Sequence, residues 1–147
     1  MFIDKLLEIC NAQAFSVDAV SSKSVDLGSN TPKTEIGAGE PMVVVIQVDV
    51  AADNTTGNET YQFDLVQDDN EDLSSPDIVC SRTFTAAELA AGKKQYINIP
   101  PGGIIEQYIG LQFDGGGTTP TVTVSAYLQP LSMIENRKDY AIGSTIL

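Results

Sequence analysis

One stretch, residues 42–50, constrains the fold of this chain more than any other. It reads MVVVIQVDV, and its β-branched valines and isoleucine suit the pleated surface of a strand. Alternate residues of a strand point to opposite sides of a sheet, so the even positions share one continuous apolar face. The other face is apolar only in its first half, at Val43 and Val45. The stretch therefore predicts a strand with one face in a core and a partly covered back.

Other stretches repeat this alternation and are separated by turns rich in Gly, Asn and Asp. About eight short strands at intervals of roughly 8–12 residues are typical of a sandwich or a jelly roll. We therefore expect one all-β domain over residues 1–147, a jelly-roll type β-sandwich. The turn chemistry at 53–58 also predicts a hairpin between 42–50 and 61–66. The expected core residues include Val44, Ile46, Val48, Phe63, Leu65, Leu111, Val122 and Val124.

One short helix is predicted between Thr85 and Gly92. Thr85 is suited to the N-cap position, and Glu88 lies three residues later, as in a capping box. Gly92 is a typical C-terminal stop. A helix of about two turns is marginal alone, so it must be held by packing.

The two ends of the chain lack the alternating pattern. In residues 1–15, four apolar side chains fit either a helical stripe or an extended arm: Phe2, Ile3, Leu6 and Leu7. So apolar an arm should dock, either on its own domain or on a partner. Residues 129–147 are expected to form an irregular tail.

Charge and hydropathy exclude several classes of protein. The formal net charge is -12, and residues 35–77 contain eleven acids but no Lys or Arg. Nucleic-acid binding, which needs a basic surface, is therefore not expected. No apolar run approaches the roughly 20 residues of a membrane span, so no membrane segment is expected. The acidic surface is either a solvated face or a face that meets a basic partner. Cys10 and Cys80 lie beside apolar residues, which indicates small buried hydrophobes rather than a disulfide.

No motif predicts catalysis, a cofactor or a metal. The chain has no His, and its glycine runs match neither a phosphate-binding loop nor a dinucleotide fingerprint. The alternate oxygens of Asp68, Asn70 and Asp72 are similar to the opening of a calcium loop. Leu73 and Val79, however, stand where such a loop has Gly and Glu, so a solvated acidic loop is the favoured interpretation.

An ordered set of short segments resembles one family, the capsid cement (decoration) proteins of short-tailed bacteriophages of the Bordetella-phage type. The segments cover residues 2 to about 130 and less of the tail. They are FIDK at 2–5, AQAF at 12–15, VDLG at 25–28, IGAGEPM at 36–42, LVQDDNE at 65–71 and EQYIGL at 106–111.

The resemblance implies a jelly roll without catalysis that binds as a dimer to the outside of an icosahedral shell. Its partner would be the major capsid protein, and the protein would fold in the host cytoplasm before joining the virion. Val43 and Val45 are the candidate dimer contact, and Phe2, Ile3, Leu6 and Leu7 are the candidate docking residues. The alternative is a carbohydrate-binding jelly-roll module of a phage fibre or adhesin.

Overall fold

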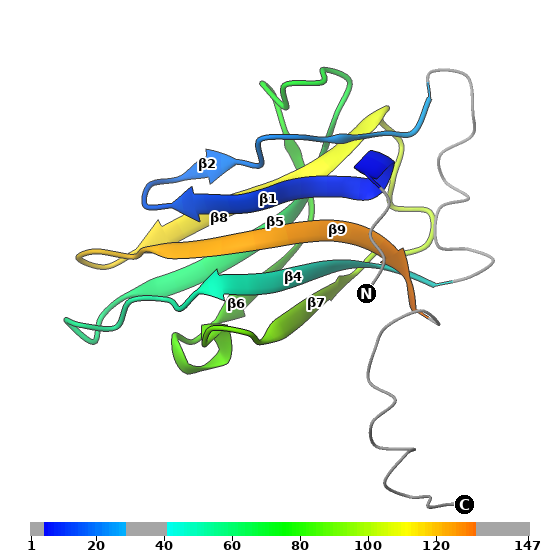
Figure 1. Ribbon diagram of the computed structural model, residues 1–147. Coiled ribbons are helices and arrows are strands. Elements are labelled where there is room, and N and C mark those ends of the chain that lie inside the picture. The colour runs from blue at the N-terminus through cyan, green and yellow to red at the C-terminus, as the bar shows by residue number, and fades with distance from the viewer. Residues whose placement is uncertain (1–4, 29–40, 132–147) are drawn as a thin grey trace, which may run out of the picture.

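The computed structural model describes residues 5–28 and 41–131, which form two antiparallel sheets packed face to face (Figure 1). Sheet A contains, in spatial order, β1 (Glu8–Phe15), β9 (Val122–Pro130), β4 (Met42–Val50) and β7 (Lys94–Asn98). Sheet B contains β2 (Ala19–Val20), β8 (Tyr108–Gly116), β5 (Thr60–Asp68) and β6 (Asp77–Phe84), and β3 (Val25–Asp26) also pairs with β8. The all-β sandwich expected from the sequence is confirmed.

The order of the strands is that of a jelly roll. Most connections cross from one sheet to the other, and β1, the first of the described strands, lies beside β9, the last of them. A four-strand layer and a five-strand layer joined in this way form the double Greek key of the jelly-roll architecture. The predicted hairpin between 42–50 and 61–66 is wrong, because β4 pairs with β7 and β9 whereas β5 pairs with β6 and β8. The turn residues at 53–58 instead carry the chain across the sandwich.

The core lies between the two sheets and is formed by the alternating residues named above. Val44, Ile46, Phe63, Leu65 and Leu111 are all completely buried. Aromatic rings fill the centre, with the Phe15 and Phe113 ring centroids 5.2 Å apart and those of Phe63 and Phe113 5.3 Å apart. The alternation of β4 ends at a register shift between Val48 and Val50, so Val50 turns outward and is 58% exposed.

The predicted helix is much shorter than expected. Its one regular turn is the 3-10 helix η3 (Ala87–Leu89). The capping box is present, since Thr85 N donates to Glu88 Oε1 at 2.9 Å and Glu88 N donates to Thr85 Oγ1 at 3.3 Å. The following carbonyls bond outside the helix, Glu88 O to Gln95 Nε2 and Leu89 O to Ala52 N. A second helical turn would need these acceptors, so tertiary hydrogen bonds end the helix.

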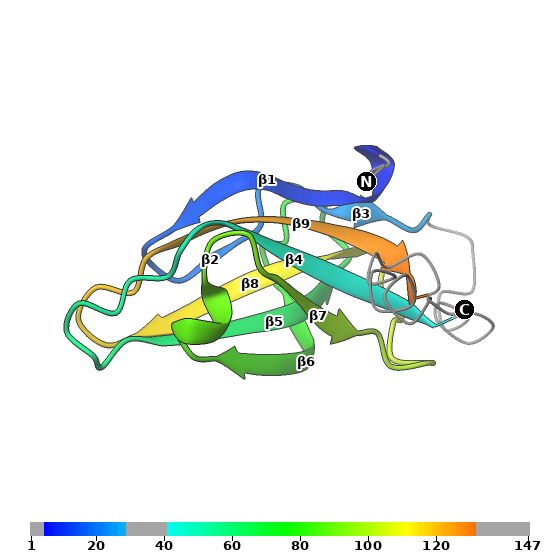
Figure 2. The ribbon, with the colours of Figure 1, turned by 60° about the horizontal axis from the view of Figure 1, so that its bottom comes forward.

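Side chains of β6 close the open side of the sandwich between the edge strands β6 and β7, which lie at the same margin in Figure 2. Arg82 donates from Nη1 to Tyr96 O at 2.6 Å, and its guanidinium lies 4.8 Å from the centre of the Phe84 ring. Cys80 Sγ donates to Asn98 O at 3.7 Å. These contacts occupy carbonyls of β7 that would otherwise offer a strand edge to another chain.

The beginning of the described chain is an extended arm with one short turn. The 3-10 helix η1 (Lys5–Leu7) leads directly into β1, and η1 contacts β3 and β9. From Glu8 onward the extended alternative holds, and Ile9, Cys10 and Phe15 are core residues. Within residues 5–28 and 41–131, no helix has the length and apolar character needed to cross a membrane.

Candidate functional site

The candidate docking residues of the N-terminal arm have different environments where the structure describes them. Phe2 and Ile3 lie outside the described residues. Leu7 is half-buried and packs against the main core, whereas Leu6 is 82% exposed. The arm is thus attached to its own domain through Leu7 and the strand that follows, and Leu6 presents an apolar side chain to solvent.

The candidate dimer residues, Val43 and Val45, lie on the outer face of sheet A. Each is only 1% exposed, in a small cluster with Tyr127 that Tyr96 also contacts. The strand register places Tyr96, Val45, Tyr127 and Glu8 in one row across the sheet. The structure thus shows a second apolar cluster, separate from the core, as the half-apolar back of residues 42–50 indicated. A contact of this face with a second copy stays a prediction.

The acidic run at 68–72 forms an anchored loop on the outer side of sheet B. Both carboxylate oxygens of Asp68 accept backbone hydrogen bonds, Oδ2 from Ser75 N at 2.6 Å and Oδ1 from Asn70 N at 3.0 Å. The Ser75 bond is the main reason why the pKa of Asp68 lies below its usual value. Leu73, at the tip, is 2% exposed, and its side chain occupies the space above Gly110. In the described residues, no group of three or more Cys, Asp or Glu side chains is arranged to hold a metal ion.

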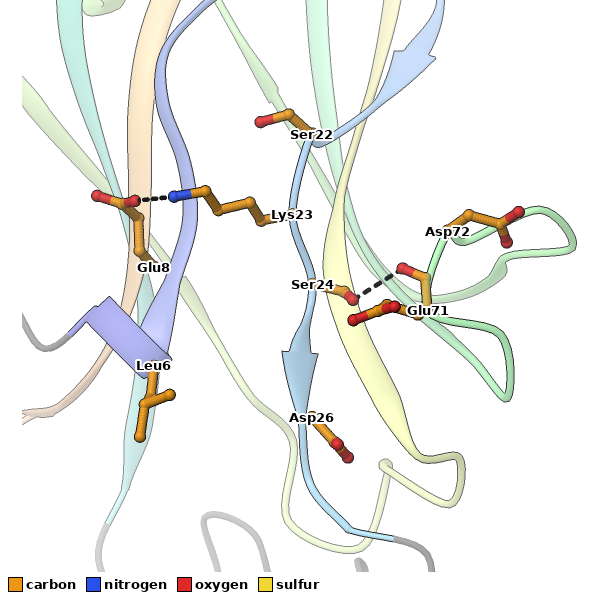
Figure 3. A pocket seen from close by; sticks show the side chains of 8 residues that line it. All are labelled: Leu6, Glu8, Ser22, Lys23, Ser24, Asp26, Glu71 and Asp72. Atoms are coloured by element: carbon orange, nitrogen blue, oxygen red, sulfur yellow. Dashed lines mark hydrogen bonds and ion pairs between the residues drawn. The ribbon is translucent and has the colours of Figure 1, made fainter.

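A cleft of about 720 Å³ with a partly polar lining lies beside the N-terminal arm and is called the arm cleft below (Figure 3). The segment 22–26 crosses its centre, with Leu6 and Glu8 on one side and the loop residues Glu71 and Asp72 on the other. Its lining residues are Leu6, Glu8, Ser22, Lys23, Ser24, Asp26, Glu71 and Asp72. The described lining thus includes four carboxylates and one ammonium group, and the Lys23 side chain points to Glu8. No sequence motif marks this cleft, because tertiary structure alone brings η1, β3 and the 69–76 loop together.

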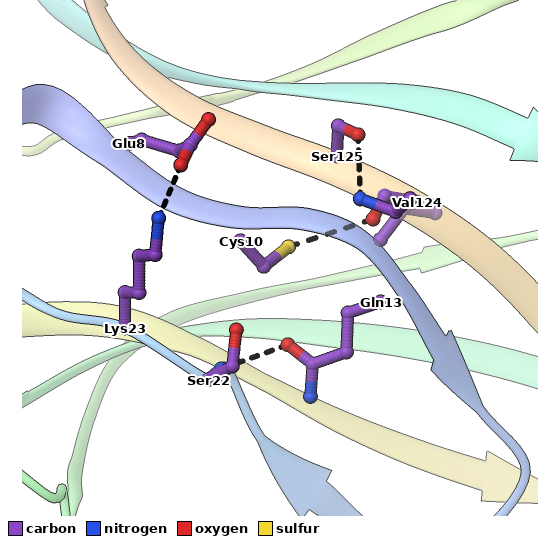
Figure 4. Close-up of polar contacts among 8 residues, drawn as sticks. Glu8, Cys10, Gln13, Ser22, Lys23, Val124 and Ser125 are labelled. Carbon is purple, nitrogen blue, oxygen red and sulfur yellow. Dashed lines mark hydrogen bonds and ion pairs between the residues drawn. The ribbon is translucent and has the colours of Figure 1, made fainter. Parts of the chain in front are cut away.

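Polar contacts attach β1 to the 22–23 segment on the same side of the molecule (Figure 4). Lys23 Nζ lies 2.5 Å from Glu8 Oε1, and Ser22 N donates to Gln13 Oε1 at 2.8 Å. Cys10 lies between these two contacts in Figure 4, and its Sγ is 3.6 Å from Val124 O. Burial is the main cause that raises the pKa of the Cys10 thiol to about 12, so the group stays a protonated core residue. Cys10 is therefore the small buried hydrophobe that the sequence predicted, while Cys80 is only half-buried.

A second acidic cluster lies where the 99–107 segment meets sheet B. Glu106 Oε2 is buried and has no hydrogen-bond partner in the described part of the chain. Burial raises the pKa of Glu106, and the nearby carboxylates of Asp77, Asp69 and Asp68 raise it further. Gln67 Oε1 holds the backbone of this segment by accepting from Ile105 N at 2.8 Å and Glu106 N at 3.2 Å.

We expect Glu106→Gln to raise the melting temperature at pH 7. The pKa of Glu106 is raised in the folded state, so its contribution to stability is complete below the unfolded pKa of about 4.3 and is lost as pH rises through the folded pKa. The neutral amide removes that loss, and the difference from wild type should shrink towards pH 4. Thermal melts at a series of pH values measure it.

Glu88→Gln is the matched control with the opposite sign. Hydrogen bonding from Thr85 N is the largest cause that lowers the pKa of Glu88, so this carboxylate stabilises the fold above its unfolded pKa. Its replacement should lower the melting temperature at pH 7, and this difference should also shrink as pH falls. A Glu106→Gln protein that melts below wild type at pH 7 would contradict the raised pKa of Glu106 in the folded state.

The fold and its surfaces are those of an acidic jelly-roll protein with an open cleft and an apolar cluster on the outer face of sheet A. The family model Bbp16 matches residues 9–128, from within β1 to within β9. The chain therefore belongs to the Bbp16 family, whose name points to a protein of a Bordetella phage. The chain matches no curated protein.

Proposed function

We propose that this chain is a capsid decoration protein that binds the outside of an icosahedral phage shell through the major capsid protein. The role is structural and non-catalytic, and the bound protein stabilises the shell. Membership of the Bbp16 family carries the proposal, because the match spans both sheets of the jelly roll. The ordered resemblance of residues 2 to about 130 to phage cement proteins supports the same role.

The distribution of aromatic side chains favours this role over the carbohydrate-binding alternative. Sugar-binding modules use exposed aromatic rings as platforms. In residues 5–28 and 41–131, every aromatic side chain is buried or half-buried, and the Phe15, Phe63 and Phe113 rings pack together in the core. The exposed side chains in this part of the chain are charged, polar or aliphatic, as at Leu6.

A gel of purified particles tests the proposed function directly. A decoration protein must be present in a copy number that rivals the major shell protein, so the 15.7 kDa chain should give a band of comparable molar intensity. Washing the particles with high salt should remove the band. Adding the purified chain back to the washed particles should restore it. A band equivalent to only a few copies per particle would favour the fibre or adhesin module.

We expect the purified chain to be a homodimer in solution. Val43 and Val45 lie in a small apolar cluster on the outer face of sheet A, and small domains with a second apolar face often pair it across a two-fold axis. Light scattering at micromolar concentration should give twice the mass of one chain. Tyr96→Glu, at the partly buried margin of the cluster, should shift the mass towards one chain. A single-chain mass for the wild type would count against the dimer.

We expect Leu6→Asp to weaken binding to bare shells by about tenfold or more while leaving the melting temperature unchanged. Leu6 is 82% exposed, so its replacement removes an apolar contact with the shell and not one with the core. Val17→Asp is the control, because Val17 is 70% exposed and follows the opposite end of β1. Co-sedimentation with shells measures both variants. Equal binding by Leu6→Asp and wild type would exclude Leu6 from docking.

A further inference from the structure

One end of the outer face of sheet A is buried, although the strands of residues 5–28 and 41–131 form only the two sheets and sheet B covers the inner face. On β4, Val43 and Val45 are each 1% exposed, whereas Asp49 on the same face is exposed. On β9, Tyr127 is 3% exposed, whereas Ser125, which donates to Asp49, is only half-buried. Side chains on an open sheet face stay in contact with solvent, so burial confined to one end indicates a cover over that end.

Gln129 lies at the same buried end and gives independent evidence for a cover. It pairs with Val43 across the sheet and is 6% exposed. Its Oε1 is buried and accepts no hydrogen bond from the described residues. Buried side-chain oxygens are almost always partnered, so the cover should supply a donor as well as apolar atoms. Val43, Val45, Tyr127 and Gln129 are called the covered end below.

Three segments of the chain lie outside the described residues, and the N-terminal one has the most suitable composition. Residues 1–4 read MFID, with two large apolar side chains side by side. Residues 29–40 read SNTPKTEIGAGE and are mostly polar, and residues 132–139 read SMIENRKD and are rich in charge. Burying charged side chains against valines and a tyrosine ring is costly. Phe2 and Ile3 carry no such cost, and their backbone N–H groups are donors that suit a buried amide oxygen.

The N-terminal segment also starts at the right place. It joins η1, which contacts β9, and β1 then begins at Glu8, directly opposite Tyr127. β4 is the second neighbour of β1 in sheet A, about 10 Å away at the usual strand spacing. Four extended residues span about 13 Å, so Phe2 and Ile3 can reach β4 from Lys5 without moving any strand.

We propose that the N-terminal arm folds back across the outer face of sheet A in its own chain, with Phe2 and Ile3 packed on the covered end. This packing does not depend on the proposed function, because it involves contacts within one chain. It gives Phe2 and Ile3 to the domain itself and leaves Leu6, which is 82% exposed, to meet the shell. A second copy would meet this face on the outside of the arm and at Tyr96, the partly buried margin of the cluster.

Nuclear Overhauser effects in the full wild-type chain test the contact directly. The ring protons of Phe2 should give cross-peaks to the methyl groups of Val43 and Val45. A filtered experiment on mixed labelled and unlabelled chains should show no such cross-peaks between copies. Their absence from the first experiment would overturn the proposal. Their presence in the second would also overturn it, because the arm would then cover the face of a second copy.

Melting curves give a second, energetic test. Phe2→Ala should lower the melting temperature by about 5 °C or more, because a packed ring is lost. Leu6→Ala is the matched control in the same arm and should shift it by less than about 2 °C. A melting temperature unchanged by Phe2→Ala would overturn the proposal. A loss caused by Ile134→Ala in its place would assign the cover to the C-terminal segment.

A double-mutant cycle locates the contact of the Phe2 ring. Phe2→Ala and Val45→Ala remove the same contact, so their combined loss in melting temperature should be smaller than the sum of the single losses. Phe2→Ala and Leu111→Ala should be additive, because Leu111 is buried between the sheets, on the other side of sheet A from the arm. Additive losses for Phe2 and Val45 would place the ring elsewhere and overturn the proposal.

Discussion

Leu111→Ala is expected to lower the free energy of unfolding by about 2–5 kcal/mol. Leu111 is completely buried in β8, where it pairs with Leu65 of β5 at the centre of sheet B. The substitution removes apolar burial and leaves a cavity that close-packed neighbours fill only in part. Urea unfolding followed by circular dichroism measures the change.

Leu6→Ala is the matched control for this cost, since it is the same chemical change at a side chain that is 82% exposed. Its effect should stay within about 0.5 kcal/mol. A Leu111→Ala loss below that figure would show that β8 faces the other way. Such a result would also place Ile109 and Phe113 outside the core, because the three residues share one face of the strand.

Gly117→Ala is expected to cost about 3 kcal/mol or more, the second large effect. Gly117 has a φ of +92°, a conformation that alanine adopts only with strain. An added Cβ would also lie 2.4 Å from Asn58 O and 2.7 Å from Glu59 Cα, and these backbone atoms cannot move aside cheaply. The backbone strain and the steric clash both arise where the loop before β5 meets the loop after β8.

Gly57→Ala separates the two terms of this prediction. Gly57 has a similar φ of +83°, but nothing lies within 4 Å of an added Cβ. Alanine there should cost only the conformational strain, about 1–2 kcal/mol. Thermal melts of the two variants should therefore differ clearly. Equal losses would mean that the contact between Gly117 and the Asn58–Glu59 backbone carries no energy.

The sequence predicted the sandwich because alternation is a local property that tertiary structure preserved. In β4, β5, β8 and β9 the inward residues are those that the period of two selects, and Leu111 and Val124 are completely buried. The pairing of strands is not a local property, so the turn residues after Val50 predict a hairpin although β4 and β5 lie in different sheets. Turn residues reverse the chain, but they do not determine which sheet receives the next strand.

The helix and the candidate site show the same difference between features set by neighbouring residues and features set by tertiary structure. The capping box between Thr85 and Glu88 is present, because it involves residues three apart. The length of the helix could not be predicted, because Ala52 and Gln95 donate hydrogen bonds to the carbonyls that a longer helix would use. The exposure of Leu6 and the arm cleft depend on how η1, β3 and the 69–76 loop meet. Residues from three separated parts of the chain form that surface, and no spacing in the sequence relates them.

The pairing of β1 with β9 dictates the order in which the domain can fold. Cys10 and Val124 are in contact although 114 residues separate them, so sheet A closes a long loop at a cost that rises with the logarithm of its length. At ribosomal speeds of about 5–20 residues per second, β1 waits on the order of 10 s for its neighbour to be synthesised. All strands of sheet B precede β9 in the chain, so that layer can assemble first. The nascent chain must therefore keep Ile9 and Phe15 away from other apolar surfaces until its last strand emerges, which makes folding slow and sensitive to crowding by unfinished neighbours.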